Sequence, residues 1–318
     1  MNARTLEILA QIAASGSLAA ASRVLNVAPS AVSRALSAAE AEIGVRLFNR
    51  STRSLSLTEA GARYLTRTAL IRAELDAARD AARDAAAAPS GRLRLTASVA
   101  FGTMCIIPHL PVLKARFPEI LPELVLTDAM VDLPAEGIDL AIRLAPQIDG
   151  DVTRARLMPT RYHVVATPSY LAARPLTTPA GLTAHPACVF SLPGFRTAWR
   201  FRNQQGEIAE HPVTPGLVAS NALALRAAAL AGLGPALLAD WLIGPDLRAA
   251  RLVDIFPDHD VTATSFDTSA WFVYPTRAFL PAKTRAAMEV LGPEIRNAAI
   301  QHVQNPAPHS LAETHQTP

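Results

Sequence analysis

The chain has 318 residues, of which 50% are hydrophobic and 18% are charged, and its formal net charge is +3. At roughly 100–200 residues per domain, this length implies two or three globular units and excludes a peptide or a disordered tail. The apolar run 227–239, which is free of charged and amide side chains, is too short to span a bilayer. The first dozen residues include Glu7 and Gln11 and lack a small-residue cleavage site, so we expect a cytoplasmic chain without a secretory signal.

The net charge is concentrated at one end of the chain. Residues 1–57 contain six arginines against three glutamates, whereas the remaining residues contain equal numbers of basic and acidic side chains. A small basic module followed by a large neutral one is suited to binding a polyanion at one end only.

The two cysteines, Cys105 and Cys188, are too few for a disulfide framework, and neither has a second pair of metal ligands nearby. We expect buried thiols, and the alternative is redox sensing by a thiolate at a helix end. No metal site is predicted.

Three short helices are predicted within the first 45 residues. Apolar positions three and four apart place the first over Thr5–Ala14, and Gly16 suits the left-handed position after it. Ser17 is the predicted N-cap of the second helix. After a short turn, Pro29 begins the third helix, and Gly44 ends it.

A two-stranded wing and a long helix are expected next. Leu47 and Phe48 pair with the alternating stretch Arg53–Leu57, with residues 49–53 at the tip. Thr58 caps a helix that runs to about Ala88. This helix needs a partner helix, and the alternative is a lone helix lying on a domain. Its heptad-type seam consists of Tyr64, Thr68, Ile71, Leu75, Ala78, Ala82 and Ala85.

From residue 92 onwards, strands alternate with helices, which predicts an α/β domain with a mostly parallel sheet. Helices are expected at Ile106–Phe117 and Asn221–Leu230, and residues 297–318 are expected to form a disordered tail. The strand candidates are Leu93–Ala97, Glu123–Thr127, Asp139–Leu144, Tyr162–Ala166, Val213–Val218 and Ala270–Tyr274.

No catalytic motif is recognisable in the chain. A P-loop, a GxSxG elbow and an HExxH motif are all absent from the sequence. The sequence Gly232-Leu233-Gly234 could suggest a dinucleotide site, but it ends an alanine-rich helix, so we expect helix termination and close backbone packing. We therefore predict no enzyme, no catalytic residue and no cofactor.

The basic N-terminal module has the pattern of a helix-turn-helix, whose second helix can enter the DNA major groove. Arg34 can bind the O6 and N7 atoms of a guanine, and the small polar side chains beside it can contact bases or phosphates. Arg50 and Arg53, at the wing tip, suit phosphates or a narrow minor groove. For each arginine alone, the alternative is a solvated surface charge. The predicted DNA-binding residues are Pro29, Ser30, Ser33, Arg34, Ser37, Arg50 and Arg53.

An ordered set of residues runs through the first 61 positions: Leu6-Glu7-Ile8-Leu9, Gly16-Ser17-Leu18-Ala19-Ala20-Ala21, Leu25-Asn26-Val27-Ala28-Pro29-Ser30-Ala31-Val32-Ser33-Arg34, Leu36, Glu40, Gly44-Val45-Arg46-Leu47-Phe48-Asn49-Arg50 and Leu57-Thr58-Glu59-Ala60-Gly61. This set resembles the N-terminal domain of LysR-type transcriptional regulators. Further along, Gly91–Leu95, Gly137–Arg143 and Ala231–Gly234 are similar to landmarks of the family's effector-binding domain. Ala28 and Pro29-Ser30 depart from the residues common in the family at those positions, so the base preference of relatives cannot be copied.

The resemblance implies an α/β fold class, with an N-terminal winged helix-turn-helix (1–58), a linker helix that pairs two subunits (59–89) and a periplasmic-binding-protein-like effector domain (90–296). Lobe I of this domain would comprise residues 90–163 and 270–296, and lobe II residues 164–269. A small-molecule effector would bind between the lobes. Arg143 suits a carboxylate effector or a structural pair with an aspartate. The implied effector-binding residues are Ser98, Val99, Ala100, Phe101, Asp128, Arg143 and Asn221.

We therefore expect a sequence-specific DNA-binding regulator that acts as a homodimer or tetramer. Its expected partners are double-stranded DNA, a small anionic effector and RNA polymerase, and no membrane. The alternative is a solute-binding or carrier protein with an incidental N-terminal module, and an enzyme on the same fold is the third hypothesis.

Overall fold

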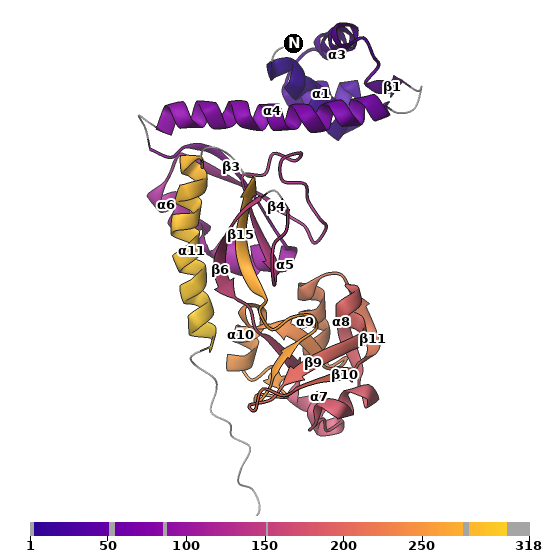
Figure 1. Ribbon diagram of the computed structural model, residues 1–318, viewed down its shortest axis with the longest axis vertical. Coiled ribbons are helices and arrows are strands. Elements are labelled where there is room, and N and C mark those ends of the chain that lie inside the picture. Colours follow the sequence, from indigo (N-terminus) through magenta and orange to yellow (C-terminus); the bar gives the residue numbers. More distant parts are fainter. Residues whose placement is uncertain (1–2, 51–54, 85–87, 151, 276–279, 304–318) are drawn as a thin grey trace, which may run out of the picture. The chain divides into compact units, whose positions relative to one another are not determined.

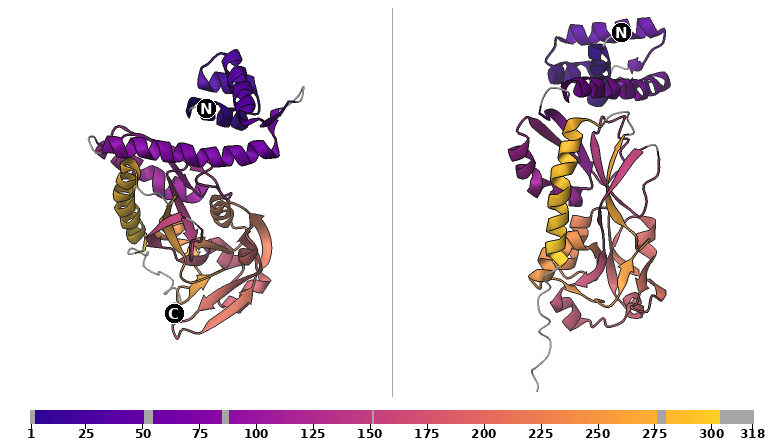
Figure 2. Two further views of the ribbon diagram at one scale, coloured as in Figure 1. Left: turned by 45° about the horizontal axis from the view of Figure 1, so that its top comes forward. Right: turned by 60° about the vertical axis from the view of Figure 1, so that its left-hand side comes forward.

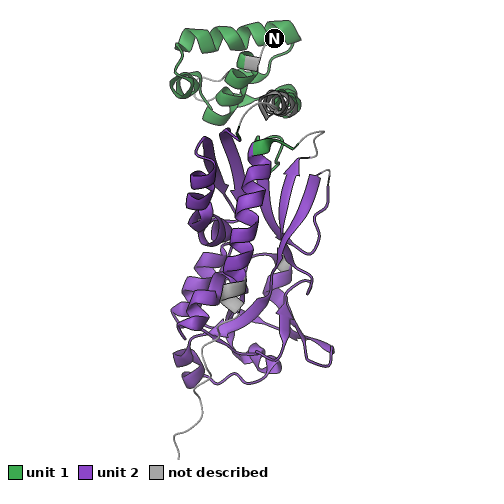
Figure 3. Ribbon diagram, turned by 90° about the vertical axis from the view of Figure 1, so that its left-hand side faces the viewer, with its two compact units in different colours: residues 1–88, 131–138, 277–282 green, residues 89–130, 139–276, 283–318 purple. Residues whose placement is uncertain are grey.

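The computed structural model describes residues 3–50, 55–84, 88–150, 152–275 and 280–303 (Figure 1). The chain divides into two compact units (Figure 3). Unit 1 consists of residues 1–88, 131–138 and 277–282, and unit 2 consists of residues 89–130, 139–276 and 283–318. Unit 1 therefore contains the predicted basic module and the long helix.

The first part of unit 1 is a three-helix module followed by a two-stranded antiparallel wing, as predicted. Nine side chains form its core, and they come from all three helices and from the start of the wing. The elements are α1 (Ala3–Ser15), α2 (Leu18–Leu25), α3 (Pro29–Ile43), β1 (Phe48–Arg50) and β2 (Leu55–Leu57).

The predicted helix boundaries are confirmed by their caps. The hydroxyl of Ser17 accepts a hydrogen bond from the amide of Ala20 at 3.0 Å, which satisfies one free donor at the start of α2. Gly16 and Gly44 have φ angles of +64° and +81°, which glycine adopts without strain. Pro29 is the first residue of α3, where its missing N–H costs nothing.

The long helix α4 (Glu59–Asp84) begins where the wing ends. Thr58 caps it by accepting a hydrogen bond from the amide of Gly61 at 2.9 Å, as predicted. Gly61 packs against the backbone: a Cβ at this position would lie 2.0 Å from the carbonyl oxygen of Leu47. The start of α4 is thereby held against Leu47, the residue that precedes β1.

The heptad seam of α4 is partly exposed within a single chain. Thr68 is buried, whereas Ile71 is 59% exposed and Leu75 is 40% exposed. The side chains of Ala78 and Ala82, and all of Ala85, lie outside the described residues.

In unit 2, a five-stranded sheet has the order β4-β3-β5-β15-β6. β3 pairs in parallel with β4 and β5, but β15 pairs antiparallel with β5 and β6. The prediction of a mostly parallel sheet is therefore wrong, because the chain returns from the second lobe in the opposite direction. The strands are β3 (Gly91–Ala97), β4 (Ile120–Leu126), β5 (Leu140–Ala145), β6 (Val152–Pro159) and β15 (Ser269–Pro275).

The second sheet of unit 2 is also mixed. Its strands follow the order β10-β9-β14-β7-β12-β8-β11, and β13 pairs with β7 beside this path. Only the β11–β8 and β12–β8 pairs are parallel. The strands are β7 (Tyr162–Ala166), β8 (Pro186–Phe190), β9 (Ala198–Arg202), β10 (Ile208–Pro212), β11 (Thr214–Ala219), β12 (Ala236–Ala239), β13 (Val253–Asp254) and β14 (Asp260–Thr262).

Helices flank both sheets (Figures 1 and 2). One hydrophobic cluster joins side chains of α6, α9, α10 and α11 with both sheets, and a second cluster lies within the second sheet's region. The two lobes therefore share part of their core. The helices are α5 (Val99–Phe101), α6 (Leu110–Arg116), α7 (Pro168–Ala173), α8 (Pro193–Thr197), α9 (Ala222–Leu230), α10 (Asp240–Arg248) and α11 (Ala282–Val303), with further short helical segments at Gly102–Ile106, Ile107–His109 and Pro179–Ala184.

Two helix predictions need correction. The expected helix Ile106–Phe117 is divided into short turns and α6, because Pro108 and Pro111 remove backbone donors. Helix α11 continues to Val303, so the first residues of the expected tail at 297–318 are helical, and residues 304–318 lie outside the described part.

The chain crosses between the lobes twice. It leaves the first sheet after β6 and enters the second at Tyr162, and it returns between Thr262 and Ser269. The Thr160 amide donates a hydrogen bond to the Thr268 carbonyl oxygen at 2.9 Å, so the two crossing segments are joined. The predicted second lobe, 164–269, is therefore slightly displaced. The second sheet already begins at Tyr162, and Ser269 belongs to β15 of the first sheet.

Candidate functional site

One face of α3 presents polar side chains to solvent. Pro29, Ser30, Arg34 and Ser37 are exposed, and Ser33 is half-buried. The opposite face packs into the core of the module through fully buried Val32 and Leu36. The structure therefore brings the five predicted DNA-binding residues of α3 to one side of the helix.

The turn before α3 is held by backbone geometry. Asn26 ends α2 in the left-handed region, with a φ angle of +52°, and its amide bonds back to α2. Ala28 supplies no side-chain cap to α3. The start of α3 therefore lacks a capping side chain that would compete with a phosphate for its amides.

The wing is fixed to α3 by Glu40. Its Oε1 atom accepts hydrogen bonds from the amides of Leu47 at 2.8 Å and Phe48 at 3.1 Å. Arg50 is the last residue of β1, although its side chain is not described, and Arg53 lies outside the described residues. Glu40 therefore holds the wing against the same helix that presents the predicted DNA-binding residues.

Between the lobes of unit 2, a direct hydrogen bond links two predicted effector-binding residues. Asp128 follows β4 in the first lobe, and Asn221 precedes α9 in the second. The Asn221 Nδ2 atom donates to Asp128 Oδ2 at 2.6 Å. The structure therefore brings together two positions that lie 93 residues apart in the chain.

The helix starts beside this bridge are already capped by side chains. The Val99 amide donates to Asp128 Oδ1 at 3.3 Å, and the Phe101 amide donates to the Ser98 hydroxyl at 3.2 Å. On the other lobe, the Asn221 Oδ1 atom accepts from the amide of Leu223 at 2.8 Å. An anion at either helix start would replace one of these acceptors.

Ala100 and Phe101 lie beneath the interlobe surface, each only 1% exposed. The Phe101 ring contacts the Trp241 ring edge-on, with centroids 5.0 Å apart. Trp241 is 4% exposed, and its indole N–H has no hydrogen-bond acceptor among the described residues. A buried donor without an acceptor is uncommon in native proteins.

Sequence reasoning did not select Trp241. The available signal was the apolar run Ala236–Ala239 followed by an acidic residue and an aromatic one, which is typical of a strand that ends at a helix start.

Arg143 is half-buried on β5, opposite Trp271 of β15 in the strand register. Ser98, Val99, Asp128 and Asn221 form the connected group described above, and Arg143 belongs to the central strand of the sheet.

A cluster of titratable side chains surrounds the start of α10. Burial raises the pKa of Asp240, although hydrogen bonds from backbone amides and the charges of His163 and Arg161 oppose the shift. Burial alone would lower the pKa of His163, but its 2.8 Å hydrogen bond to Asp254 and the nearby carboxylates raise it overall. Burial and the charge of Asp240 raise the pKa of Cys105 to about 12.

Both cysteines are buried and free, as predicted. Burial also raises the pKa of Cys188. Both thiols therefore stay protonated and unreactive near neutral pH. Gly232 and Gly234 end α9 with positive φ angles, and a Cβ at Gly234 would lie 2.0 Å from the carbonyl oxygen of Pro186, so helix termination with close packing is confirmed.

Within the described ranges, no group of three or more His, Cys, Asp or Glu side chains is placed to hold a metal ion. Among these same residues, no helix combines the length and apolar character needed to cross a bilayer.

Two family descriptions match the chain and together cover most of its length. Residues 3–62 match "Bacterial regulatory helix-turn-helix protein, lysR family", and residues 86–296 match "LysR substrate binding domain".

Similar proteins cover most of the chain as well. The HTH-type transcriptional regulator CrgA of Neisseria meningitidis serogroup C is 33% identical over 81% of this chain and 86% of its own length. The match to the solved structure of CrgA from Neisseria meningitidis covers 93% of this chain and 99% of that chain, with 29% identity and a TM-score of 0.58. The full-length AphB structure from Vibrio cholerae, at 24% identity and a TM-score of 0.60, covers 92% of this chain and 98% of its own and shares the fold.

Proposed function

The chain belongs to the LysR family of transcriptional regulators, and from this premise we propose which of its residues read DNA and which hold the effector. Members of this family bind DNA and small-molecule effectors and form oligomers. Transcriptional regulators of this kind are typically not enzymes.

For DNA recognition, we propose that α3 enters the major groove with its exposed face toward the bases. Arg34 is the residue assigned to a guanine edge, since its guanidinium can donate two parallel hydrogen bonds to O6 and N7. Ser30, Ser33 and Ser37 contact bases or phosphates beside it, and Pro29 contacts a thymine methyl group. The observation that supports this proposal is that these side chains share the solvent-facing side of α3.

We assign Arg50 and Arg53 to the DNA backbone at the wing. Phosphate contacts position a protein on DNA without reading sequence. An Arg53→Ala variant should therefore weaken binding to all sequences and reduce the salt dependence by about one phosphate contact.

For effector binding, we propose that a small anionic molecule binds between the lobes. The assigned contacts are Ser98, Val99, Ala100, Phe101, Asp128, Arg143 and Asn221. The hydrogen bond between Asp128 and Asn221 supports this assignment, because a ligand that replaces it changes the contact that joins the two lobes.

The proposed mechanism is a shift between two arrangements of the paired subunits. An effector with different affinities for the two arrangements changes the spacing of the DNA-binding modules, which bends the DNA and alters access for RNA polymerase. This regulation takes place in the cytoplasm.

We further propose that α4 pairs with the same helix of a second subunit. The exposure of Ile71 and Leu75 supports this pairing, since apolar side chains at heptad positions pack in the seam of a coiled coil. The proposed division is 1–58 for DNA binding, 59–89 for pairing and 90–296 for effector binding.

The pairing proposal predicts that Leu75→Asp lowers the oligomeric mass, because a carboxylate in the seam is costly to bury. Sedimentation equilibrium measures this mass, and Arg67→Asp, at an exposed position on the same helix, is the control. An unchanged mass for Leu75→Asp would remove the seam from the interface.

The proposed function is tested by sequencing the genomic DNA fragments that the purified chain retains. Enrichment of a few pseudo-palindromic sites is the expected result, because paired modules read two half-sites. Uniform retention that disappears with added salt would contradict it, since this is the behaviour of non-specific electrostatic binding.

The effector assignment has its own test. A panel of small organic acids is screened for those that change the melting temperature of the full-length chain, and the hits are repeated on Asn221→Ala. Loss of the shift in Asn221→Ala, with DNA affinity unchanged, is the expected result. An identical shift in the variant would contradict the assigned site.

A further inference from the structure

A cavity lies where the chain crosses between the lobes, and none of the seven assigned effector-binding residues lines it. Its volume is about 190 Å³. Its walls come from the end of β6, from the first crossing at 159–162, from β9 and from the returning segment 260–268. Both lobes therefore contribute to one site.

Three arginines, Arg156, Arg161 and Arg202, line this cavity, against the two carboxylates of Asp260 and Asp267. The lining therefore has an excess of positive charge. Clustered guanidinium groups with their forked donors are suited to carboxylate and phosphate oxygens.

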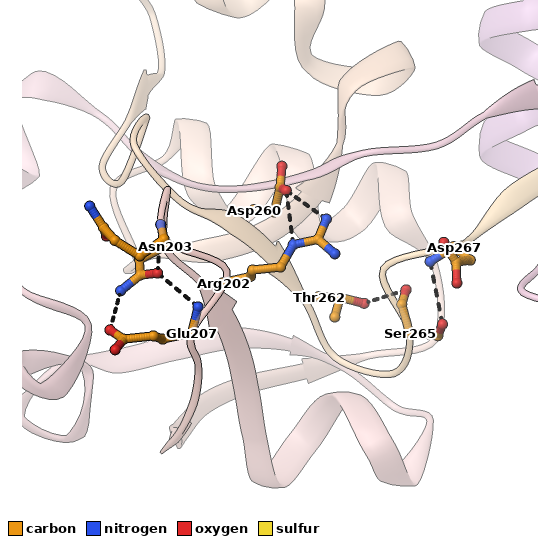
Figure 4. Close-up of polar contacts among 8 residues, drawn as sticks. Arg202, Asn203, Glu207, Asp260, Thr262, Ser265 and Asp267 are labelled. Atoms are coloured by element: carbon orange, nitrogen blue, oxygen red, sulfur yellow. Dashed lines mark hydrogen bonds and ion pairs between the residues drawn. The ribbon is translucent and has the colours of Figure 1, made fainter.

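One arginine of the cavity is already paired. Arg202 donates to Asp260 Oδ2 through Nε at 3.2 Å and Nη2 at 2.7 Å, and its guanidinium lies over the Phe266 ring, 4.4 Å from the centroid. Figure 4 shows Arg202 directed toward Asp260. These contacts fix the position of the Arg202 side chain in the cavity lining.

The other two arginines are not neutralised in this way. Arg156 donates through Nε to the Ser269 hydroxyl at 3.0 Å. In the part of the chain that the structure describes, no carboxylate lies within ion-pair distance of Arg156 or Arg161. Arg156 therefore retains positive charge that a bound anion could balance, and Arg161, whose charge also acts on Asp240, adds to the positive charge of the lining.

Thr160 also lines the cavity, but its hydroxyl group is buried in the wall. Thr160 is 3% exposed, and its Oγ1 atom has almost no solvent-accessible surface and no hydrogen-bond partner among the described residues. A ligand in the open cavity therefore meets the arginine side chains and not this hydroxyl group.

We propose that this cavity binds a small oxyanion, with the exposed side chains of Arg156 and Arg161 supplying the positive charge. The ligand is a carboxylate or a phosphate, since both offer oxygens to forked guanidinium donors. An anion in this cavity contacts both crossing segments and so stabilises one orientation of the lobes. The proposal is independent of the effector site assigned to Asp128 and Asn221.

The test is calorimetric titration of the full-length chain with sodium succinate and, separately, with inorganic phosphate at constant ionic strength. One saturable site per chain for either anion is expected, and the anion that binds identifies the source as organic or inorganic. No saturable binding of either anion at millimolar concentration would overturn the proposal.

Variants assign the titrated site to this cavity. Arg156→Gln should weaken the anion about tenfold, as expected for the loss of a charged hydrogen bond. Arg154→Gln, two residues earlier on β6 and outside the lining, is the matched control and should leave binding unchanged.

Thr160→Val has nearly the same shape as the native side chain and removes only the buried hydroxyl. We expect unchanged anion binding with a melting temperature that is unchanged or higher, because the hydroxyl has no partner among the described residues. Anion affinity that is unchanged in Arg156→Gln would overturn the proposal. An Asn221→Ala variant should bind the anion normally, which separates this site from the assigned effector site.

Discussion

The N-terminal module exposes most of its assigned DNA-binding side chains, whereas the effector domain buries several polar side chains that support its fold. On α3, the assigned DNA-binding side chains are mostly exposed, and they lie over a core of nine buried residues. In the effector domain, by contrast, Asp246 is fully buried between two arginines, Asp240 is largely buried, and Thr160 is 3% exposed.

In the N-terminal module, a mutation of these exposed side chains should change binding without changing stability. In the effector domain, a mutation of a buried polar side chain should change the stability of the domain as well. An exposed side chain can be truncated with little effect on folding, so its loss is felt mainly by the partner. A buried polar group, once truncated, leaves its neighbours unpaired and lowers the stability of the whole domain.

The three tryptophans make the two regions distinguishable. Trp199, Trp241 and Trp271 all belong to the effector domain, so tryptophan fluorescence during urea denaturation follows that domain alone. DNA affinity reports on the N-terminal module.

The largest expected effect is that of Asp246→Ala. Asp246 is 0% exposed and accepts hydrogen bonds from Arg226 at 2.5 and 2.9 Å, and it pairs with Arg251 at 2.7 Å. Removing it should lower the free energy of unfolding by about 3–5 kcal/mol, because two cations lose their partner. The tryptophan transition in urea measures this change.

The control for Asp246 is Asp260→Ala. Asp260 also pairs with an arginine, but its side chain is 51% exposed, so the loss should be at most about 1 kcal/mol. Equal losses for the two variants would break the comparison between buried and exposed polar groups.

A smaller effect, confined to the other region, is expected for Gly61→Ala. The added Cβ would lie 2.0 Å from the Leu47 carbonyl oxygen, which also accepts a hydrogen bond from the Thr58 amide at 2.9 Å. Overpacking of this kind costs about 1–3 kcal/mol. We expect weaker binding to specific and unrelated DNA alike, with an unchanged tryptophan transition.

Ala60→Gly, at the exposed neighbouring position, controls for a change of helix propensity and should cost about 1 kcal/mol or less. A shift of the tryptophan transition in Gly61→Ala would show that the two regions do not unfold independently.

The smallest effect is a gain of stability from Asp240→Asn. The pKa of Asp240 is raised in the folded chain, so the folded state binds its proton more tightly than the unfolded state does. The resulting stability is complete below the unfolded pKa, near 4, and is lost as the pH rises through the folded pKa. At pH 7 the buried carboxylate therefore costs stability, and Asn, which keeps an oxygen for the Trp241 amide, should raise the melting temperature.

The gain from Asp240→Asn should shrink as the pH falls toward 4. Glu119→Gln, at an exposed position, is the control and should show no gain. A lower melting temperature for Asp240→Asn at pH 7 would mean that the charged form of Asp240 is the stabilising one.

The N-terminal module could be predicted closely because its signals are local. Ser17, Gly16, Pro29 and Gly44 each act within four residues of the helix end that they define. The exposed face of α3 follows from helical spacing alone, so the grouping of its assigned residues needs no long-range information.

The effector domain was less predictable because its strands are short and its pairings are distant. β12 is a run of four buried residues, which periodicity cannot distinguish from part of a helix. β9 does alternate, with Trp199 and Phe201 buried and Arg200 exposed, but a five-residue alternation indicates neither its direction nor its neighbours. Helices α10 and α11 contain Pro245 and Pro293, which argue against a helix in sequence.

The candidate sites of the effector domain were hard to predict for the same reason, since they join residues that are distant in the sequence. The crossing cavity joins residues from 156 to 268, and sequence patterns do not reveal that Thr160 and Thr268 are hydrogen-bonded. The interlobe positions were available only through the family resemblance, since 93 residues separate Asp128 from Asn221.

The most direct test of the account is the affinity of Arg34→Ala for a retained genomic site and for unrelated DNA, each measured over a range of salt concentrations. We predict a loss of about 1–3 kcal/mol on the specific site, a much smaller loss on unrelated DNA and an unchanged tryptophan transition. Unchanged specific affinity, or equal losses on both DNAs, would contradict the assignment of α3 as the helix that reads the bases.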